Sequence, residues 1–517
     1  MNPISLKNPQ ITRNLVSGKI LARNTILNFI GQVIPLLVGV ITIPFIVRGL
    51  GIERFGLLSL AWVVLGYFTI FDLGLGRATT KYVAEALGKG EEDQVPSLVW
   101  TAVTVQAILG VVGALVLFGI TPLLVERILN IPTELVGEAK FTFYLLALSI
   151  PVVLISSSFR GVLEAAQRFE LVNAVKCPTS ILTFLLPLVG LLLGFRLPGI
   201  VVLILVARFG ALLTFVVMNL RIFPRLRIYS GSFTFFARLF AYGGWITVTN
   251  IVGPILVYSD RFLIGSILSI AMVAYYSAPY DAVTRLWIIP ASLNMTLFPA
   301  FSTLEGTKDR QKLGILFAHS IKYVLLVLGV AILMIGLFAK EILQIWLGAD
   351  FAIKSTVALQ ILAFGVLINS LAHIPFALLQ GIGRPDLPAK FHLLELPLYI
   401  GLVWFLISQW GIAGAAVAWT LRGALDAFLL FGATFKIYRF SPRLLITNGA
   451  TLACFALVIL AGASYGLKTL TGTLPLLAQS LLVLGLLALF ALFAWKSILD
   501  NSERGAILNV VKLWKNP

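Results

Sequence analysis

The sequence predicts an all-α polytopic membrane protein with about fourteen transmembrane helices. Three observations support this fold class. The 517 residues are 59% hydrophobic and only 12% charged, with a mean hydropathy of +0.99, which excludes ordinary soluble domains. Apolar runs long enough to cross about 30 Å of hydrocarbon recur along the whole chain. The two halves of the chain resemble one another, which indicates two six-helix lobes followed by two C-terminal helices.

The apolar runs are continuous and do not alternate with polar residues, so they predict helices and exclude a closed β-barrel. A helix satisfies its backbone hydrogen bonds within one segment, as the hydrocarbon core requires. The predicted spans cover residues 25–47, 56–76, 97–120, 141–159, 178–195, 199–220, 243–265, 272–296, 321–339, 356–380, 391–408, 411–433, 445–466 and 475–495.

An internal repeat relates the first six spans to the next six. A shift of 218 residues places span one on span seven. A shift of 216 aligns "LEAAQRFELVNA" (163–174) with "LQGIGRPDLPAK" (379–390), so that Arg168 matches Arg384 and Glu170 matches Asp386. Near the ends of the halves, "ARFGALLTF" (207–215) resembles "LRGALDAF" (421–428) after a small insertion. The repeat therefore keeps its order over six spans.

Six spans in each half give both halves the same orientation in the membrane. They are then related by an axis along the membrane normal, and a cleft is expected between them. The expected parts are a cytoplasmic tail (1–24), an N-lobe with spans one to six (25–220), a basic amphipathic linker (221–242), a C-lobe with spans seven to twelve (243–438), and spans thirteen and fourteen with a cytoplasmic tail (439–517). A solvated basic loop is the alternative for the linker.

The distribution of the 39 Lys and Arg residues predicts the orientation. Most fall in the two tails, in the linker and in the loop around Arg310, which all lie on one face and should be cytoplasmic. The net charge of +17 is spread over short loops that face an anionic leaflet, so we expect membrane lipids and no nucleic acid as partners. The only cysteines, Cys177 and Cys454, indicate neither a disulfide framework nor a metal site.

Charged residues inside the spans are candidates for function, because an intramembrane charge usually faces a cavity or a partner. Some fall at i, i+4 spacing and can neutralise each other on one helix face, so structural pairing is the alternative for them. These pairs are Arg160 with Glu164, Asp281 with Arg285, and Arg422 with Asp426.

Other intramembrane charges have no such partner. Asp260 and Arg261 are about 100° apart around a helix, so we expect that they do not share one partner and that at least one points into the cleft. Arg208 has no carboxylate three or four residues away. It is either a cross-helix partner of Asp426 or Asp281, or a free anion-binding group.

Two further sites combine charge with a helix-weakening residue. Glu395 precedes Pro397, which frees a backbone carbonyl, so Glu395 is a candidate proton carrier or a plain hydrogen-bonded carboxyl. In "FDLGLGRATTKY" (71–82), Gly74 and Gly76 place Asp72 and Arg77 at a predicted hinge, where a positive stripe could receive an acidic headgroup. Simple positive-inside anchoring is the alternative.

The sequence resembles the polysaccharide transporters of the multidrug/oligosaccharidyl-lipid/polysaccharide (MOP) exporter superfamily, which include the Wzx-type O-antigen flippases. The resemblance covers most of the chain and rests on three segments. They are "NFIGQVIPLLVGVITIPFIVRGLGIERFGLLSLAW" (28–62), "FDLGLGRATTKYVAE" (71–85) and "YSDRFLIGSILSIAMVAYYSAPYDAV" (258–283).

The resemblance implies two six-helix lobes around a V-shaped cavity, alternating access, and export of a lipid-linked (undecaprenyl-diphosphate) oligosaccharide across the cytoplasmic membrane of a bacterium or archaeon. Cavity arginines would attract the diphosphate and membrane carboxylates would couple transport to a proton or sodium gradient. The candidates are Arg77, Arg208, Arg261, Arg285 and Arg422 for the substrate, and Asp72, Asp260, Asp281, Asp426 and Glu395 for coupling. Implied partners are a polysaccharide polymerase and glycosyltransferases, and no cofactor or metal is expected.

Two other functions remain open. A cation-coupled multidrug exporter of the same superfamily would share the lobes but would prefer an acidic cavity, against which the arginines argue. A membrane enzyme acting on lipid-linked glycans would need catalytic external loops. The longest external connection, 121–140, holds no histidine, and the chain has no GxxxxGK[ST] motif for ATP. A transporter that is not an enzyme is therefore the preferred hypothesis.

Overall fold

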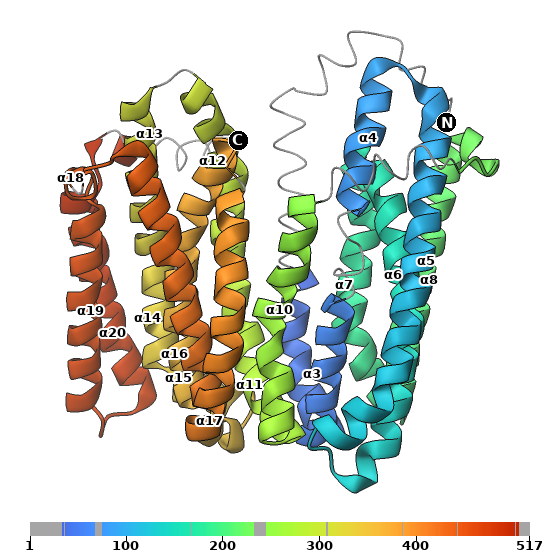
Figure 1. Ribbon diagram of the computed structural model, residues 1–517. Helices are drawn as coiled ribbons and strands as arrows, with labels where there is room; N and C mark the ends of the chain where they lie inside the picture. The colour runs from blue at the N-terminus through green and yellow to red at the C-terminus, as the bar shows by residue number, and fades with distance from the viewer. Residues whose placement is uncertain are drawn as a thin grey trace, which may run out of the picture. The chain divides into compact units, whose positions relative to one another are not determined.

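The computed structural model of the chain is built from α-helices joined by short turns (Figure 1). It describes residues 34–35, 37–67, 75–166, 168–231, 244–306, 309–384, 386–441, 443–501 and 503–505. The predicted all-α class is confirmed by this helical architecture. Asp72 and residues 232–242 of the predicted linker lie outside the described residues.

Nine helices of the described chain are long and apolar enough to cross a membrane. One of them, α17 (Asp386–Tyr438), runs through both predicted spans eleven and twelve. Gly411, where predicted span twelve begins, breaks this helix with a φ of 59°. Such a positive φ favours glycine, which has no Cβ to clash. The predicted membrane class therefore holds, while the number of fourteen helices stays a prediction.

The chain forms two compact units. The first contains residues 1–278 and 396–412, and the second contains residues 279–395 and 413–517. The described helices of the first unit are a helix within 37–50, α3 (Ile52–Tyr67), α4 (Leu75–Lys89), α5 (Val95–Leu123), α6 (Val136–Ala165), α7 (Phe169–Leu192), α8 (Leu197–Ile222), α10 (Gly244–Ile267), the first part of α11 (Ile270–Thr284) and residues 396–412 of α17.

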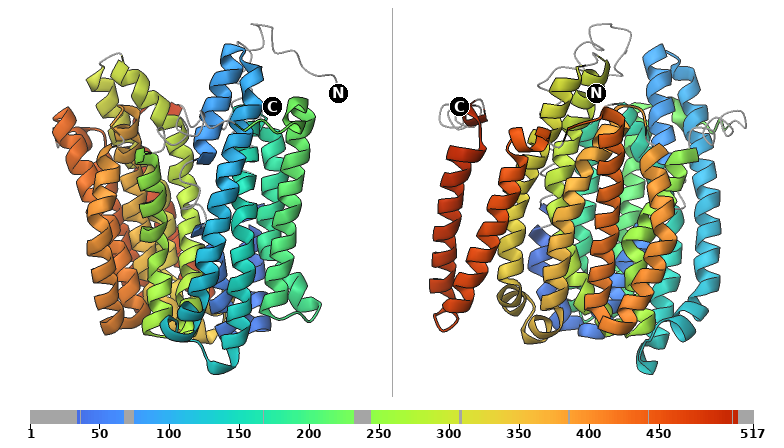
Figure 2. Two further views of the ribbon diagram at one scale, coloured as in Figure 1. Left: turned by 45° about the vertical axis from the view of Figure 1, so that its right-hand side comes forward. Right: turned by 60° about the vertical axis from the view of Figure 1, so that its left-hand side comes forward.

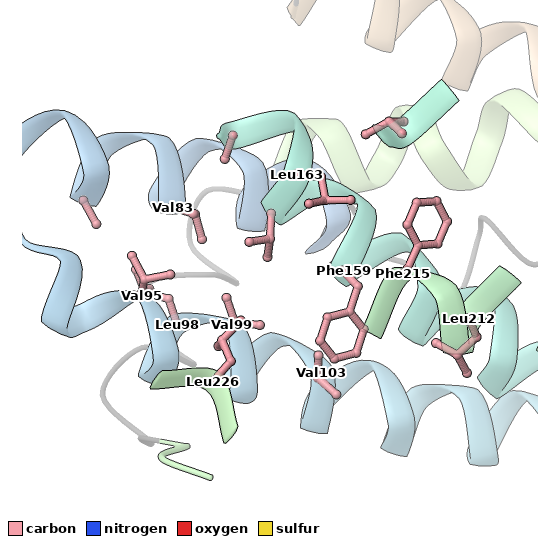
Figure 3. Packing of buried hydrophobic residues seen from close by; sticks show 14 of the residues in the cluster. Val83, Val95, Leu98, Val99, Val103, Phe159, Leu163, Leu212, Phe215 and Leu226 are labelled. Carbon is pink, nitrogen blue, oxygen red and sulfur yellow. The ribbon is translucent and has the colours of Figure 1, made fainter. Parts of the chain in front are cut away.

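The core of the first unit lies between α4, α5, α6 and α8. Its buried side chains include Val83, Val99, Phe159 and Phe215, which Figure 3 shows together with their neighbours. Helices α5 and α6 approach closely, since a Cβ on Gly110 would lie 2.5 Å from the Cα of Pro151. The close approach fixes α6, which carries part of the site described below.

The second unit contains the rest of α11, α12 (Ile288–Gly306), α13 (Arg310–Val324), α14 (Val330–Leu337), α15 (Ala339–Trp346), α16 (Ala349–Gly381), parts of α17, α18 (Arg443–Thr447), α19 (Ala450–Leu470) and α20 (Leu476–Phe493). Helices α19 and α20 run side by side in all views (Figures 1 and 2). A π-helical turn, Ala494–Ile498, extends α20.

A buried ion pair ties the C-terminal segment to α13. The Nζ of Lys322 lies 2.7 Å from Oε1 of Glu503, and the side chains are 2% and 8% exposed. Tyr323 donates a second hydrogen bond to Glu503 at 2.6 Å. Glu503 and Asp500 also accept hydrogen bonds from each other's backbone N–H, as in a helix capping box.

The aligned repeat segments share one turn. The N–H of Arg168 donates to the carbonyl of Leu163 at 2.9 Å, and the N–H of Arg384 donates to the carbonyl of Leu379 at the same distance. Arg168 pairs with Glu170, as Arg384 pairs with Asp386. The two halves therefore enter α7 and α17 through the same local structure.

Candidate functional site

A basic cavity lies between α6, α7 and α8 of the first unit. Its volume is about 290 Å³. Three cationic side chains line it, one from each helix: Arg160, Lys176 and Arg208. Five hydroxyl side chains complete the polar lining: Ser156, Ser157, Thr179, Ser180 and Thr183. We call it the Arg208 cavity.

Helical periodicity explains why these residues meet. On α7, the side chains at 176, 179, 180 and 183 follow i, i+3, i+4 and i+7 spacing and therefore share one face. On α6, Ser156 and Arg160 are one turn apart. Gln106 of α5 packs behind this turn, donating to Ser157 at 3.1 Å and accepting from Ser158 at 2.6 Å. A polar stripe on each helix thus faces a common space within an apolar bundle.

The charges of the Arg208 cavity do not balance. Glu164 neutralises Arg160 at 3.4 Å, which confirms the predicted i, i+4 pair. The Nε of Arg208 is buried and has no hydrogen-bond partner among the described residues. A buried donor without a partner costs about 1–3 kcal/mol, and more when the group is charged. The cavity is therefore suited to an anion that supplies oxygen acceptors.

Sequence reasoning found Arg208 but missed Lys176. The predicted span began at residue 178, whereas α7 begins at Phe169, so Lys176 was assigned to a loop. The signal that could have revealed it is the polar face "KCPTSILT" (176–183) within an apolar helix.

Asp260 and Arg261 contact each other, an arrangement that their separation of about 100° around the helix did not predict. The Nη1 of Arg261 lies 3.6 Å from Oδ1 of Asp260, and its backbone N–H donates to the same oxygen at 2.8 Å. The hydroxyl of Tyr276 donates to Oδ2 of Asp260 at 2.7 Å. A long arginine side chain can fold back on its neighbour, so the two residues form a pair with each other. That one of them points into the cleft stays a prediction. Both side chains are buried, at 0% and 1% exposed.

A second polar cluster lies in the second unit. The Nη1 of Arg422 lies 3.6 Å from Oε2 of Glu395, and Nε2 of His392 lies 3.8 Å from Oδ1 of Asp426. Glu395, Arg422 and Asp426 are 1%, 7% and 5% exposed. We call these four residues the Glu395 cluster. The sequence predicted Arg422 with Asp426 but did not link either to Glu395.

The repeat relates the two sites. Within the aligned segments 207–215 and 421–428, Arg208 corresponds to Arg422. Each half therefore carries an arginine at the same place within an apolar helix. In the part of the chain that the structure describes, Arg422 forms an ion pair with Glu395, whereas the Nε of Arg208 has no hydrogen-bond partner.

The remaining predicted residues are Asp281, Arg285, Arg77 and Asp72. Asp281 is half-buried near the end of α11, and Arg285 is exposed in the short 3-10 turn that follows. Arg77 belongs to α4, but its side chain is not among the described ones, and Asp72 lies outside the described residues.

An apolar groove of about 410 Å³ lies between α14, α16 and α19 of the second unit. Its walls include Ile332, Leu333, Phe364, Leu457 and Val458. Polar side chains contribute little to it. The groove is suited to a hydrocarbon chain, and α19 is the helix that the sequence predicted as span thirteen.

Comparison with known proteins now gives the family. Residues 21–305, more than half of the chain, match the family described as polysaccharide biosynthesis protein. A candidate O-antigen transporter of Shigella flexneri is 30% identical over 414 residues, which cover 79% of this chain and 96% of that protein.

Two solved structures share the fold. The lipid II flippase MurJ in its inward closed conformation has a TM-score of 0.71 at 13% identity, covering 93% of this chain and 100% of that one. An inward-facing multidrug resistance MATE family transporter of the MOP superfamily has a TM-score of 0.69 at 16% identity, covering 80% of this chain and 94% of that one. The chain belongs to the polysaccharide biosynthesis protein family and has the fold of the MOP transporters.

Proposed function

We propose that the protein moves a lipid-linked oligosaccharide, carried on undecaprenyl diphosphate, across the membrane for surface polysaccharide biosynthesis. The observation that carries this proposal is the Arg208 cavity. Its guanidinium and ammonium groups suit phosphate oxygens, to which charge-assisted hydrogen bonds are about twice as strong as neutral ones. Its five hydroxyl side chains suit sugar hydroxyls. The O-antigen transporter relative supports the same substrate class.

The transport path follows from the amphiphilic substrate. The headgroup contacts the Arg208 cavity, while the isoprenoid tail stays in the hydrocarbon of the membrane. Alternating access of the two lobes then exposes the headgroup on the other side. No covalent bond is made or broken in this step, so the protein acts as a transporter.

The Glu395 cluster is proposed as the coupling site. Two buried carboxylates share one arginine and one histidine, so a proton or sodium ion bound there changes the local charge balance. Release of that cation would strengthen the electrostatic attraction between Arg422 and the carboxylates of Glu395 and Asp426. A change in these ion pairs within α17 would favour one conformation of the unit over another.

The cellular setting follows the same proposal. The protein lies in the cytoplasmic membrane with both termini in the cytoplasm, as the distribution of Lys and Arg indicates. Glycosyltransferases on that face supply the lipid-linked glycan, and a polymerase on the other face consumes it.

The proposal is tested with purified protein in liposomes that contain a labelled undecaprenyl-diphosphate oligosaccharide. We expect a protein-dependent rise in the fraction of label that an external reagent can reach. Imposed proton or sodium gradients then reveal the coupling ion. Transport of organic cations with no exposure of the glycan lipid would overturn the proposal in favour of a drug exporter.

A further inference from the structure

A second groove of the second unit has a charged end and an apolar body. Its volume is about 460 Å³. Among the described residues, the charged side chains that line it are Arg384 and Lys436. The rest of the lining is apolar: Leu387, Phe391, Phe428, Leu429, Gly432, Ala433 and Ile437. We call it the Lys436 groove.

The groove is formed by the two ends of α17. Leu387 and Phe391 are one turn apart near its beginning. Phe428, Gly432 and Lys436 follow i, i+4, i+8 spacing near its end and therefore share a face. A Cβ on Gly432 would meet no atom within 4 Å, so the glycine leaves open space between the two walls.

The charged end of the groove carries surplus positive charge. Asp386 accepts hydrogen bonds from Arg384 at 2.9 Å and 3.3 Å, and from Lys390 at 3.0 Å. One carboxylate thus serves two cations, and Lys436 adds a third cationic group at the groove. The negative charge of an anionic headgroup would offset this excess of positive charge.

The repeat shows that the apolar body lacks the cover that its counterpart has. Phe428 corresponds to Phe215 in the aligned segments. Phe215 is 6% exposed within the core of the first unit, whereas Phe428 is 74% exposed. The same position is therefore filled by protein in one half and left open in the other.

We propose that the Lys436 groove binds an anionic phospholipid. Its phosphate lies between Arg384 and Lys436, and one acyl chain lies along Phe391, Phe428 and Gly432. Anionic lipids are recognised in this way by basic pockets between membrane helices. The transport substrate fits less well, because the lining offers no hydroxyl or amide side chain for sugars, in contrast to the Arg208 cavity.

The test is lipid binding by the purified full-length protein in detergent, measured by native mass spectrometry with phosphatidylglycerol and phosphatidylcholine of equal chain length. We expect preferential retention of phosphatidylglycerol. The double variant R384Q/K436Q should weaken its binding about tenfold, which corresponds to about 1.4 kcal/mol. K496Q, which removes an exposed lysine elsewhere, is the matched control and should bind like wild type.

A second variant tests the contribution of the apolar body of the groove separately from that of its charges. Gly432→Trp fills the apolar body and leaves both cations in place, so it should reduce phosphatidylglycerol binding by a similar factor. Thermal unfolding without lipid verifies that each variant is folded. Equal retention of both lipids by wild type, or unchanged binding by both variants, would overturn the proposal. Stronger competition by undecaprenyl diphosphate than by phosphatidylglycerol would also overturn it, since the groove would then be a substrate site.

Discussion

The guanidinium of Arg422 lies 3.6 Å from the carboxylate of Glu395, across the break in α17 at Gly411. Both side chains are buried. The two parts of α17 that carry them belong to the same compact unit. We propose that a cation bound at this ion pair alters the electrostatics of the second unit.

Glu395→Gln should remove the dependence of transport on an ion gradient. The amide keeps the volume of the side chain but can neither bind a cation nor release a proton. Transport driven by substrate alone should persist. The measurement is glycan-lipid flipping in liposomes with and without an imposed gradient. Glu134→Gln, at an exposed position, is the control, and retained gradient dependence in E395Q would exclude Glu395 as the coupling group.

Arg261→Ala should destabilise the first unit by about 3–5 kcal/mol, because it leaves the buried carboxylate of Asp260 without its cation. Tyr276 and the backbone N–H of residue 261 still donate to that carboxylate, but neutral hydrogen bonds do not replace the charge. Thermal unfolding in detergent measures the loss, and D260N/R261M should recover much of it. An R261A variant as stable as wild type but unable to transport would instead place Arg261 in the substrate path.

Glu503→Gln should loosen the C-terminal segment, because the buried ammonium of Lys322 loses its anionic partner. The expected cost is about 3–5 kcal/mol for a buried pair. Lys340→Gln, at an exposed lysine of α15, should have little effect. Hydrogen exchange over residues 494–505 reports the loosening directly. Unchanged protection there would show that the pair does not hold the segment.

The ion pair between Lys322 and Glu503 also predicts that the stability of the protein depends on pH. Burial alone would raise the pKa of Glu503, but hydrogen bonds from Lys322 and Tyr323 outweigh it and lower the pKa below its ordinary value. A lowered pKa means that the stabilisation is complete above about pH 4.3, the ordinary value for glutamate, and is lost as the pH falls through the lowered pKa. Unfolding of wild type should show this acid loss, and E503Q should show less of it.

Gly110→Leu should disrupt the packing of α5 on α6, since even a Cβ would lie 2.5 Å from Pro151. Overpacking of this kind costs about 1–3 kcal/mol or more. Gly119→Leu on the same helix is the matched control, because a Cβ there meets no atom within 4 Å. The melting temperatures of the two variants decide the point, and equal values would contradict the close approach of the helices.

Much of the fold could be predicted because hydropathy reports the part of each helix that lies in hydrocarbon. It does not report the parts that extend beyond. Helix α4 was not predicted because its charged residues offset its apolar ones, and α7 begins nine residues before the predicted span. Lys176 was missed for the same reason. The hydroxyl residues of α7 lie inside the predicted span, but uncharged side chains barely lower its hydropathy.

The site could be predicted only where a single charged residue interrupts an apolar run. Arg208 and Glu395 were found in this way. Their neighbours depend on side-chain reach and on helix pairing, which one sequence does not encode locally. Arg261 folds back on Asp260, and the break at Gly411 brings Glu395 to Arg422, although 27 positions separate them.

The central claim is that the Arg208 cavity holds the diphosphate of a glycan lipid during transport. The most direct measurement is the initial rate of flipping of labelled undecaprenyl-diphosphate oligosaccharide by wild type, R208Q, K176Q and the control K140Q, at equal amounts of folded protein in liposomes. Loss of a charge-assisted hydrogen bond worth about 1.5–3 kcal/mol predicts a drop of at least tenfold at limiting substrate for R208Q and K176Q, with K140Q unchanged. Wild-type rates in both R208Q and K176Q would contradict the account.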